Sequence, residues 1–444
     1  MPLSRRELLG AGAGLALALE SCGGSGRERP NVVFAFSDEH RWQSLSFTET
    51  PALRTPRLER LAAEGTQVNG CLSNYPVCRP FRAMLQTGQW PAQNGVLGNA
   101  SVLETDANTL GRRFRAAGYT TGYIGKWHLG SRYVVPFGYD FSRVWRNTNN
   151  HWDCGYYDGP GPEDRVPLAG LYNAEAMTYQ AIEYLEQGPQ APFFLVLSYN
   201  PPHPSYTDAP KEFLDLYPDE ASLPLRGNLD ASSFDESQWL DYRGYHAHIS
   251  ALDRELGRFL DALDRLGLAD NTIVVYTSDH GTMLGSHGLW GKRLPHEESI
   301  RVPLLVRWPG RVPAGRELAG SFDSVDFLPT LLELTGLAAE SALPGRSRAE
   351  ALLGGAAESD DQLLMQCSTE KDNEDEPDVP LYRGIRTASH TLAVGEDGPW
   401  LFFDNRADPL QVENRVAAVP AATLDDLTER LRGLQSRAGD SFRV

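Results

Sequence analysis

The sequence has no apolar stretch long enough to span a membrane, and it has very little lysine. A spanning helix needs roughly 18 to 20 apolar residues, and no segment of the 444-residue chain approaches that length. This predicts that the folded part is soluble. Lysine occurs only as Lys126, Lys211, Lys292 and Lys371, against 37 arginines. A lysine in a candidate site of such a chain therefore indicates that a compact ammonium group is required there.

Cysteine is also scarce and shows no paired spacing. The five cysteines are Cys22, Cys71, Cys78, Cys154 and Cys367. Proteins built on a disulfide framework carry many regularly spaced cysteines in a short chain. The count excludes such a framework here, although a single disulfide stays open. Internal repeats are absent as well.

Positive charge is in deficit. The chain has 59 Asp and Glu against 41 Lys and Arg, a formal net charge of −18. An acidic surface repels nucleic acid and anionic membranes, so we expect no nucleic-acid partner. An anionic substrate is not excluded, because a site carries its own local field.

The first 26 residues differ from the rest. Arg5 and Arg6 precede an Ala, Gly and Leu run and a small-residue segment around Cys22. This order is typical of an export signal, and the paired arginines resemble a twin-arginine signal. Cys22 lies in a loose lipobox, so either cleavage or lipidation at this cysteine stays open. We therefore expect an exported protein, periplasmic or extracellular, and membrane-anchored if Cys22 is lipidated.

Three short apolar runs end in polar clusters, at residues 31–36, 192–198 and 272–277. Buried parallel strands have this pattern, and amphipathic helical segments lie between them. The sequence therefore predicts an α/β fold over residues 30–345, with a large, mostly parallel sheet flanked by helices. Residues 346–444 carry short strand-like runs and an amphipathic helix over about 422–434. They predict a smaller C-terminal α+β domain.

Polar residues follow the first and third of these runs. Asp38 comes just after the first, and Asp279 and His280 come just after the third. Carboxyl ends of parallel strands meet at one edge of a sheet, where ligands bind. Carboxylate oxygens suit a hard divalent cation such as Ca²⁺, so we expect a cation site at this edge.

Residues 78–88, CRPFRAMLQTG, resemble the signature of the formylglycine-dependent sulfatases of the alkaline phosphatase superfamily. The segments TPRLERLAAEG (55–65) and GKWHLG (125–130) match other family motifs, and residues 277–308 follow the family's second conserved stretch. The resemblance covers most of the mature chain. It implies hydrolysis of sulfate esters.

The resemblance also implies how the nucleophile is made and how the metal is bound. Cys78 would be oxidised to formylglycine by a formylglycine-generating enzyme, and the hydrated aldehyde would attack sulfur and bind the cation. Asp38, Asp279 and His280 would complete the calcium site. Glu39 stands where the family commonly has Asp, so its role as a metal ligand is left open.

Further roles follow from the same resemblance. Arg82, Lys126 and Lys292 would bind the sulfate oxygens. His203, together with Lys292, would protonate the departing alcohol, and His128 would take up a proton when sulfate is released. Histidine suits either transfer because its ordinary pKa is near 6.5.

Two alternatives stay open at this point. A phosphodiesterase or phosphonate monoester hydrolase of the same superfamily would share the metal and the nucleophile. An exported binding lipoprotein with a disabled site would share the fold, although the retained catalytic residue types argue against it. The substrate would be a small-molecule or oligosaccharide sulfate ester. Aromatic residues within 133–167 either stack on sugar rings or pack a long loop, and we favour a sulfated carbohydrate.

Overall fold

The computed structural model describes residues 29–444, apart from gaps at 131–132, 146–149, 153, 160, 167–169, 191, 224, 231, 233, 339–342 and 372–376. The predicted export signal, with Cys22, lies outside the described residues. No helix in the described part combines the length and apolarity needed to cross a membrane. The four cysteines within it are free thiols, so they form no disulfide with one another.

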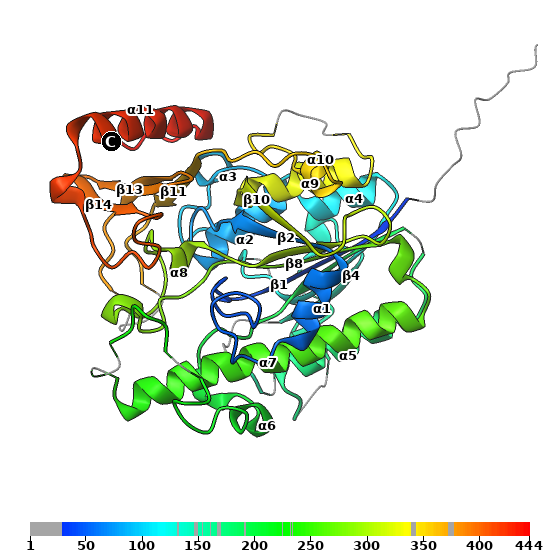
Figure 1. The fold of residues 1–444 in the computed structure, drawn as a ribbon. Helices are drawn as coiled ribbons and strands as arrows, with labels where there is room; N and C mark the ends of the chain where they lie inside the picture. Colours follow the sequence, from blue (N-terminus) through cyan, green and yellow to red (C-terminus); the bar gives the residue numbers. More distant parts are fainter. Residues whose placement is uncertain are drawn as a thin grey trace, which may run out of the picture.

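A ten-stranded sheet forms the centre of the molecule (Figure 1). Its order is β10-β2-β9-β8-β1-β7-β3-β4-β5-β6, and most neighbouring pairs are parallel, which confirms the predicted sheet. Only β9 and β5 run against their neighbours. The strands are β1 (Asn31–Ser37), β2 (Thr66–Cys71), β3 (Thr120–Lys126), β4 (Phe141–Trp145), β5 (Tyr156–Tyr157), β6 (Arg165–Val166), β7 (Phe193–Ser198), β8 (Thr272–Ser278), β9 (Leu304–Arg307) and β10 (Arg316–Phe322).

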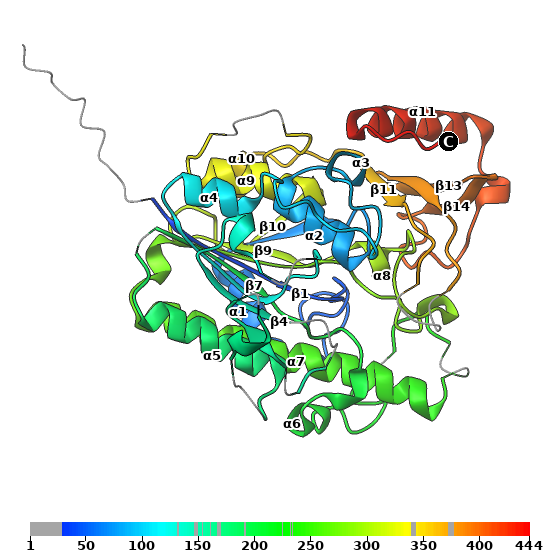
Figure 2. The same cartoon turned by 180° about the vertical axis from the view of Figure 1, so that it is seen from behind.

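Helices cover both faces of this sheet (Figures 1 and 2). Alternate side chains of β1 serve the two faces, because successive residues of a strand point to opposite sides. Val33 and Ala35 join one apolar core, and Phe34 and Phe36 join the other. The first core is closed by α1 (Pro56–Glu64), α5 (Asn173–Glu186) and α7 (Glu236–Arg265), and the second by α2 (Cys78–Thr87), α4 (Leu110–Ala116) and α9 (Phe327–Leu334).

The long helix α7 shows why these segments are helical. Its buried apolar residues recur at three- and four-residue spacing, which places them on one face. They include Ile249, Leu252, Leu256 and Phe259, all fully buried. The helix begins with a capping box, in which the Asp235 side chain accepts from the backbone N–H of Gln238.

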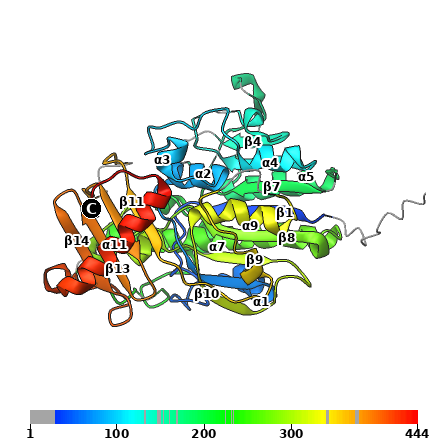
Figure 3. The same ribbon diagram turned by 90° about the horizontal axis from the view of Figure 1, so that it is seen from above.

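A second, four-stranded antiparallel sheet lies at one end of the molecule, with α11 (Ala421–Ala438) across it (Figure 3). Its strands are β11 (Gln362–Gln366), β12 (Tyr382–Arg386), β13 (His390–Gly395) and β14 (Gly398–Asp404). This confirms a smaller α+β unit. Its core includes Tyr75, which precedes α2, and Met84 on α2, so the small sheet packs against the helical layer of the larger part. The boundary at 345/346 stays a prediction.

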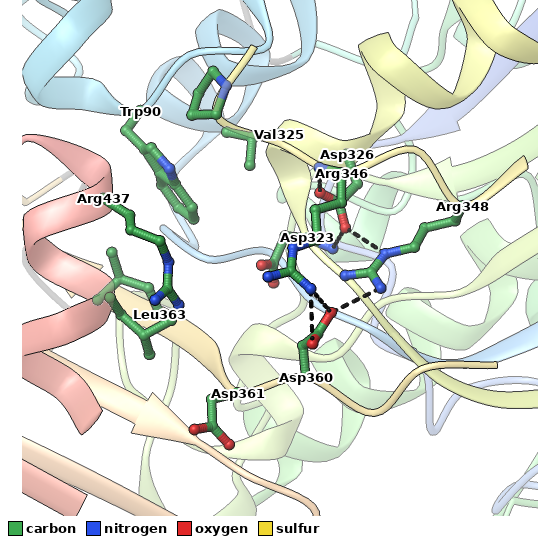
Figure 4. A pocket seen from close by; sticks show the side chains of 12 residues that line it. Trp90, Asp323, Val325, Asp326, Arg346, Arg348, Asp360, Asp361, Leu363 and Arg437 are labelled. Carbon is green, nitrogen blue, oxygen red and sulfur yellow. Dashed lines mark hydrogen bonds and ion pairs between the residues drawn. The ribbon is translucent and has the colours of Figure 1, made fainter. Parts of the chain in front are cut away.

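Charged residues line a cavity of about 180 Å³ between the two parts (Figure 4). Arg348 pairs with Asp326 at 3.0 Å and with Asp360 at 2.9 Å. Arg346 also pairs with Asp360, at 3.1 Å. These ion pairs connect β10–α9 to the segment that enters the small sheet. The cavity contains none of the residues predicted for the catalytic site.

Candidate active site

Two of the predicted strand ends lie side by side. β1 pairs in parallel with both β7 and β8, and Ser37 lies opposite Ser278. The residues that follow, Asp38 and Asp279, are therefore adjacent. One carboxylate oxygen of Asp279, Oδ1, accepts from the backbone N–H groups of Glu39 (3.1 Å) and His280 (3.0 Å). These bonds fix the two chain turns against each other.

Cys78 is the first residue of α2 and is 1% exposed. Its Sγ lies 3.1 Å from His280 Nε2, 3.3 Å from Lys292 Nζ and 3.6 Å from Asp38 Oδ1. The helix N-terminus directs partial positive charge at this atom. Burial, followed by the nearby Asp38 carboxylate, raises the pKa of the thiol well above its ordinary value. The structure thus brings together Cys78 and three of its predicted partners.

Arg82 and Lys126 contact the carboxylates. Arg82 Nη2 lies 3.0 Å from Asp38 Oδ2 and 2.8 Å from Asp279 Oδ2, and Lys126 Nζ lies 2.7 Å from Asp38 Oδ2. All four side chains are buried. Burial acts to raise the pKa of Asp38, but Lys126, His203 and Arg82 outweigh it and hold that pKa well below the usual range. Arg82 therefore holds the carboxylates of Asp38 and Asp279 close together.

Gly125 lets Lys126 reach this position. It has φ +112°, and a Cβ there would lie 2.1 Å from the Ser198 carbonyl oxygen of β7. Only glycine tolerates both the conformation and the approach. The first glycine of the GKWHLG segment is therefore required because it allows β3 to approach β7 closely just before Lys126.

Lys292 is paired with Glu39, the residue whose role was left open. Lys292 Nζ lies 2.7 Å from Glu39 Oε1, and Tyr206 donates to Glu39 Oε2 at 3.3 Å. Both oxygens of Glu39 are therefore engaged within the protein. Burial raises the pKa of Glu39, although Lys292 opposes this. In this arrangement Glu39 positions the lysine next to Cys78.

The two predicted proton-transfer histidines flank this cluster. A ring nitrogen of His203 lies within 4.8 Å of carboxylate oxygens of Asp38 and Glu39. His128 is held by its backbone, whose carbonyl accepts from Arg79 Nε at 2.8 Å. Burial and the Lys126 ammonium lower the pKa of both histidines well below the usual value.

Comparison with known proteins decides the family. Residues 30–337 match the Sulfatase family, and residues 285–437 match the family described as N-sulphoglucosamine sulphohydrolase, C-terminal. The chain belongs to the sulfatase family.

Individual relatives support the assignment to the sulfatase family. An ulvan-active sulfatase of Formosa agariphila is 33% identical over 94% of this chain and 83% of its own length. A solved structure described as a complex with its substrate D-glucosamine-2-N,6-O-disulfate aligns with TM-score 0.80 and 25% identity, covering 93% of this chain and 97% of that one. The phosphonate monoester hydrolase of Agrobacterium radiobacter shares the fold, with TM-score 0.71 and 22% identity over 92% and 96%.

The residues of this sulfatase fit a divalent cation. One ligand atom from each of Asp38, Cys78, Asp279 and His280 lies within 4.8 Å of the others. Asp38 and Asp279 each pair with Arg82 through Oδ2. Their Oδ1 atoms lie 3.8 Å and 3.6 Å, respectively, from His280 Nε2. The other ring nitrogen of His280 lies 2.8 Å from the Gly281 carbonyl. A proton held there leaves Nε2 unprotonated and able to bind metal.

Sequence reasoning missed two supporting residues. Ser198 ends β7, accepts from Arg82 Nη1 at 2.7 Å and donates to the Lys126 carbonyl at 2.8 Å. Its place at the polar end of a predicted strand was the available signal. No pattern in the sequence indicated Tyr206, because its contact with Glu39 depends on how the 199–210 segment folds back.

Proposed function

We propose that this sulfuric ester hydrolase uses a formylglycine made from Cys78 as its nucleophile, with Ca²⁺ beside it. One observation carries the proposal: Cys78 begins α2 within 3.6 Å of Asp38, His280 and Lys292 side-chain atoms. When present, the cation and the hydrated aldehyde would supply an acidic, correctly oriented oxygen nucleophile. The rest of the chemistry falls to side chains of this chain.

Asp38, Asp279 and His280 would hold the cation. Arg82 keeps the two carboxylates in place and prevents their mutual repulsion from spreading them apart. Lys126 and Lys292 are buried ammonium groups paired with Asp38 and Glu39. They would stabilise charge on the sulfate oxygens as the sulfur–oxygen bond breaks.

Proton transfer would belong to His203, Lys292 and His128. Lys292, with His203 on the β7 side, would give the leaving alcohol its proton. His128 would accept a proton when sulfate is released. These are the roles that the family resemblance implies. The contact of Lys292 with Cys78 and the closeness of His203 to Asp38 and Glu39 support them.

The substrate we propose is a sulfated carbohydrate. Relatives named for ulvan activity and for a glucosamine disulfate complex support this choice.

We further propose that the protein is exported through the signal in residues 1–26. A formylglycine-generating enzyme would modify Cys78, and the protein would be anchored to a membrane if Cys22 is lipidated.

Phosphonate hydrolysis is the second candidate, because a phosphonate monoester hydrolase has the same fold. Single-turnover rates on matched aryl sulfate and aryl phosphonate separate the two.

Calcium binding tests the proposed centre. Asp279→Ala should remove bound calcium and sulfatase activity together, because it deletes one of two buried carboxylates. Asp261→Ala is the matched control, since Asp261 is half exposed on α7 and pairs with the surface arginines Arg57 and Arg60. Full activity of a rigorously metal-free protein, or normal calcium content in Asp279→Ala, would contradict the assignment.

A further inference from the structure

Two histidines and an aspartate come together outside the catalytic cluster. His151 follows β4, Asp208 ends the 3₁₀ helix η3 (Tyr206–Asp208) after β7, and His248 lies on α7. His151 Nδ1 lies 2.8 Å from Asp208 Oδ1, and His248 Nε2 lies 3.3 Å from the same oxygen. Both histidines are fully buried, whereas the Asp208 side chain is 30% exposed. Three segments far apart in the sequence thus converge on one oxygen atom.

These spacings match those of ligand atoms around a small metal ion. One ligand atom from each of the three residues lies within 4.8 Å of the others. Ligand atoms about 2.0–2.1 Å from a tetrahedral zinc ion are about 3.4 Å from one another, close to both measured distances. Two imidazole nitrogens with one carboxylate favour zinc over calcium, which prefers roughly six to eight oxygen ligands.

The state of His248 suits a metal ligand. Burial, followed by the neighbouring His151, lowers the pKa of His248 to about 4, so this ring is neutral at neutral pH. Its Nδ1 lies 2.6 Å from the Tyr172 hydroxyl. A proton on Nδ1, donated to that hydroxyl, leaves Nε2 unprotonated and facing Asp208, as in histidines that bind metal through one nitrogen and are oriented through the other.

Hydrogen bonds alone do not complete the bonding of this cluster. His151 Nε2 is buried and has no hydrogen-bond partner within the part of the chain that the structure describes. Native proteins pair almost all buried polar atoms, and an ion or an ordered water often accounts for the exceptions. The Ser205 carbonyl oxygen lies 3.2 Å from His248 Nε2, close enough to act as a fourth ligand. The exposed edge of Asp208 gives ions access from solvent.

We propose that His151, Asp208 and His248 bind one Zn²⁺, at a site separate from the catalytic cation. The ion joins the segment after β4 to η3 and α7. Trp152 already connects two of these segments, because its Nε1 donates to the Asp208 carbonyl at 2.7 Å. The site uses neither Cys78 nor its modification, so the inference does not depend on the proposed nucleophile.

The zinc site lies next to a contact of the catalytic cluster. Tyr206 begins η3, two residues before Asp208, and its hydroxyl donates to Glu39 at 3.3 Å. Glu39 in turn pairs with Lys292. A zinc ion on Asp208 therefore stabilises the short helix that places Tyr206 beside the active site.

Zinc binding by protein with a disabled catalytic cluster tests this site. Asp279→Ala protein, freed of metal and titrated with ZnCl₂ in a calorimeter, should bind about one zinc ion per chain. Adding Asp208→Asn should weaken the affinity more than roughly 100-fold, which exceeds the effect of a lost second-shell partner. Adding Tyr172→Phe, which removes such a partner of His248, should weaken it roughly tenfold.

Controls separate the loss of a ligand from a general disturbance. His390→Gln, a change in the small sheet, should leave zinc affinity unchanged in the same background. Zinc should also raise the thermal midpoint of the Asp279→Ala protein but not that of the variant with Asp208→Asn added, because only the first binds the ion when folded. Absence of zinc binding, or equal affinity with and without Asp208→Asn, would overturn the inference. Calcium content and sulfatase activity of the wild type report on the proposed function separately.

Discussion

Asp38 performs two tasks with its two carboxylate oxygens. Oδ2 receives Arg82 and Lys126, and Oδ1 faces Cys78 and His280. Buried ions are stable only when they are paired and hydrogen-bonded. The cations on Oδ2 therefore keep a fully buried carboxylate charged while its other oxygen stays directed at the reaction centre.

Lys292 is predicted to act on the reaction rather than on the metal. Lys292→Met should lower kcat by about 10²- to 10⁴-fold, the usual range for a lost proton-transfer group, with calcium content unchanged. Lys211→Met is the matched control, because the Lys211 side chain is 84% exposed and pairs with Asp215 on the surface. Steady-state kinetics and metal analysis give both readouts.

The same substitution leaves Glu39 buried without its cation. A double variant, Glu39→Gln with Lys292→Met, removes both charges and guards against simple misfolding. If kcat of a folded, calcium-loaded variant stays within twofold of the wild type, Lys292 has no part in proton transfer.

Motifs in the sequence predicted which residues gather, but not how they pair. Asp38, Cys78 and Asp279 were expected at one sheet edge because they follow strand ends or lie in a recognisable segment. Arg82 was expected on the sulfate, yet it contacts the two carboxylates, and Glu39 contacts Lys292. Such pairings depend on side-chain directions across elements far apart in sequence, which no local pattern specifies.

At the scale of elements, α1 depends on a side chain from another helix. Its own N-cap residue, Thr55, makes no side-chain capping bond. Asp253 of α7 instead accepts from the backbone N–H groups of Arg57 (3.0 Å) and Leu58 (2.7 Å). These are among the donors that a helix start leaves without intrahelical partners.

Removing this cap should destabilise the fold. Asp253→Ala should lower the free energy of unfolding by about 1–2 kcal/mol, as for other lost helix caps. Asp253→Asn should cost less because its oxygen still accepts. Urea denaturation would measure both, with the exposed Asp261→Ala as the control. Equal stability of Asp253→Ala and wild type would show that the bond contributes nothing.

The regularity of an element decided whether the sequence could predict it. β1, β7 and β8 were predicted because each is a continuous apolar run buried on both faces. β5 and β6 have two residues each, too few for any period to show. In the small sheet β13, β14 and α11 were expected, whereas β12 contains Gly384 and two arginines and shows no apolar run.

At the scale of the molecule, several histidines away from the active site are buried and neutral. Burial, followed by the neighbouring His287, lowers the pKa of His296 to about 3. Burial, followed by His151, lowers that of His248 to about 4. As the pH falls, these histidines take up protons near pH 6.5 in the unfolded chain but only at lower pH in the folded chain. Their contribution to folding stability is therefore fully present above pH 6.5 and is lost as the pH falls toward 4. Asp323, whose pKa is raised to about 7, acts in the opposite sense.

Replacing one such histidine should reduce acid lability. His296 packs against Phe403 with ring centroids 5.2 Å apart, so His296→Phe keeps an aromatic contact. The wild type should lose about 2 kcal/mol more than this variant between pH 7 and pH 5. Urea midpoints at the two pH values would show it. An identical pH dependence in both proteins would contradict the assignment.

The central claim is that Cys78 becomes the catalytic aldehyde, and the mass of one peptide tests it most directly. Trypsin should release residues 61–82 intact, since proline follows Arg79. Protein produced together with a formylglycine-generating enzyme should yield this peptide with an aldehyde in place of the Cys78 thiol, in proportion to its sulfatase activity. Cys78→Ala should be folded and inactive. A fully active preparation whose peptide carries only the unmodified thiol would contradict the account.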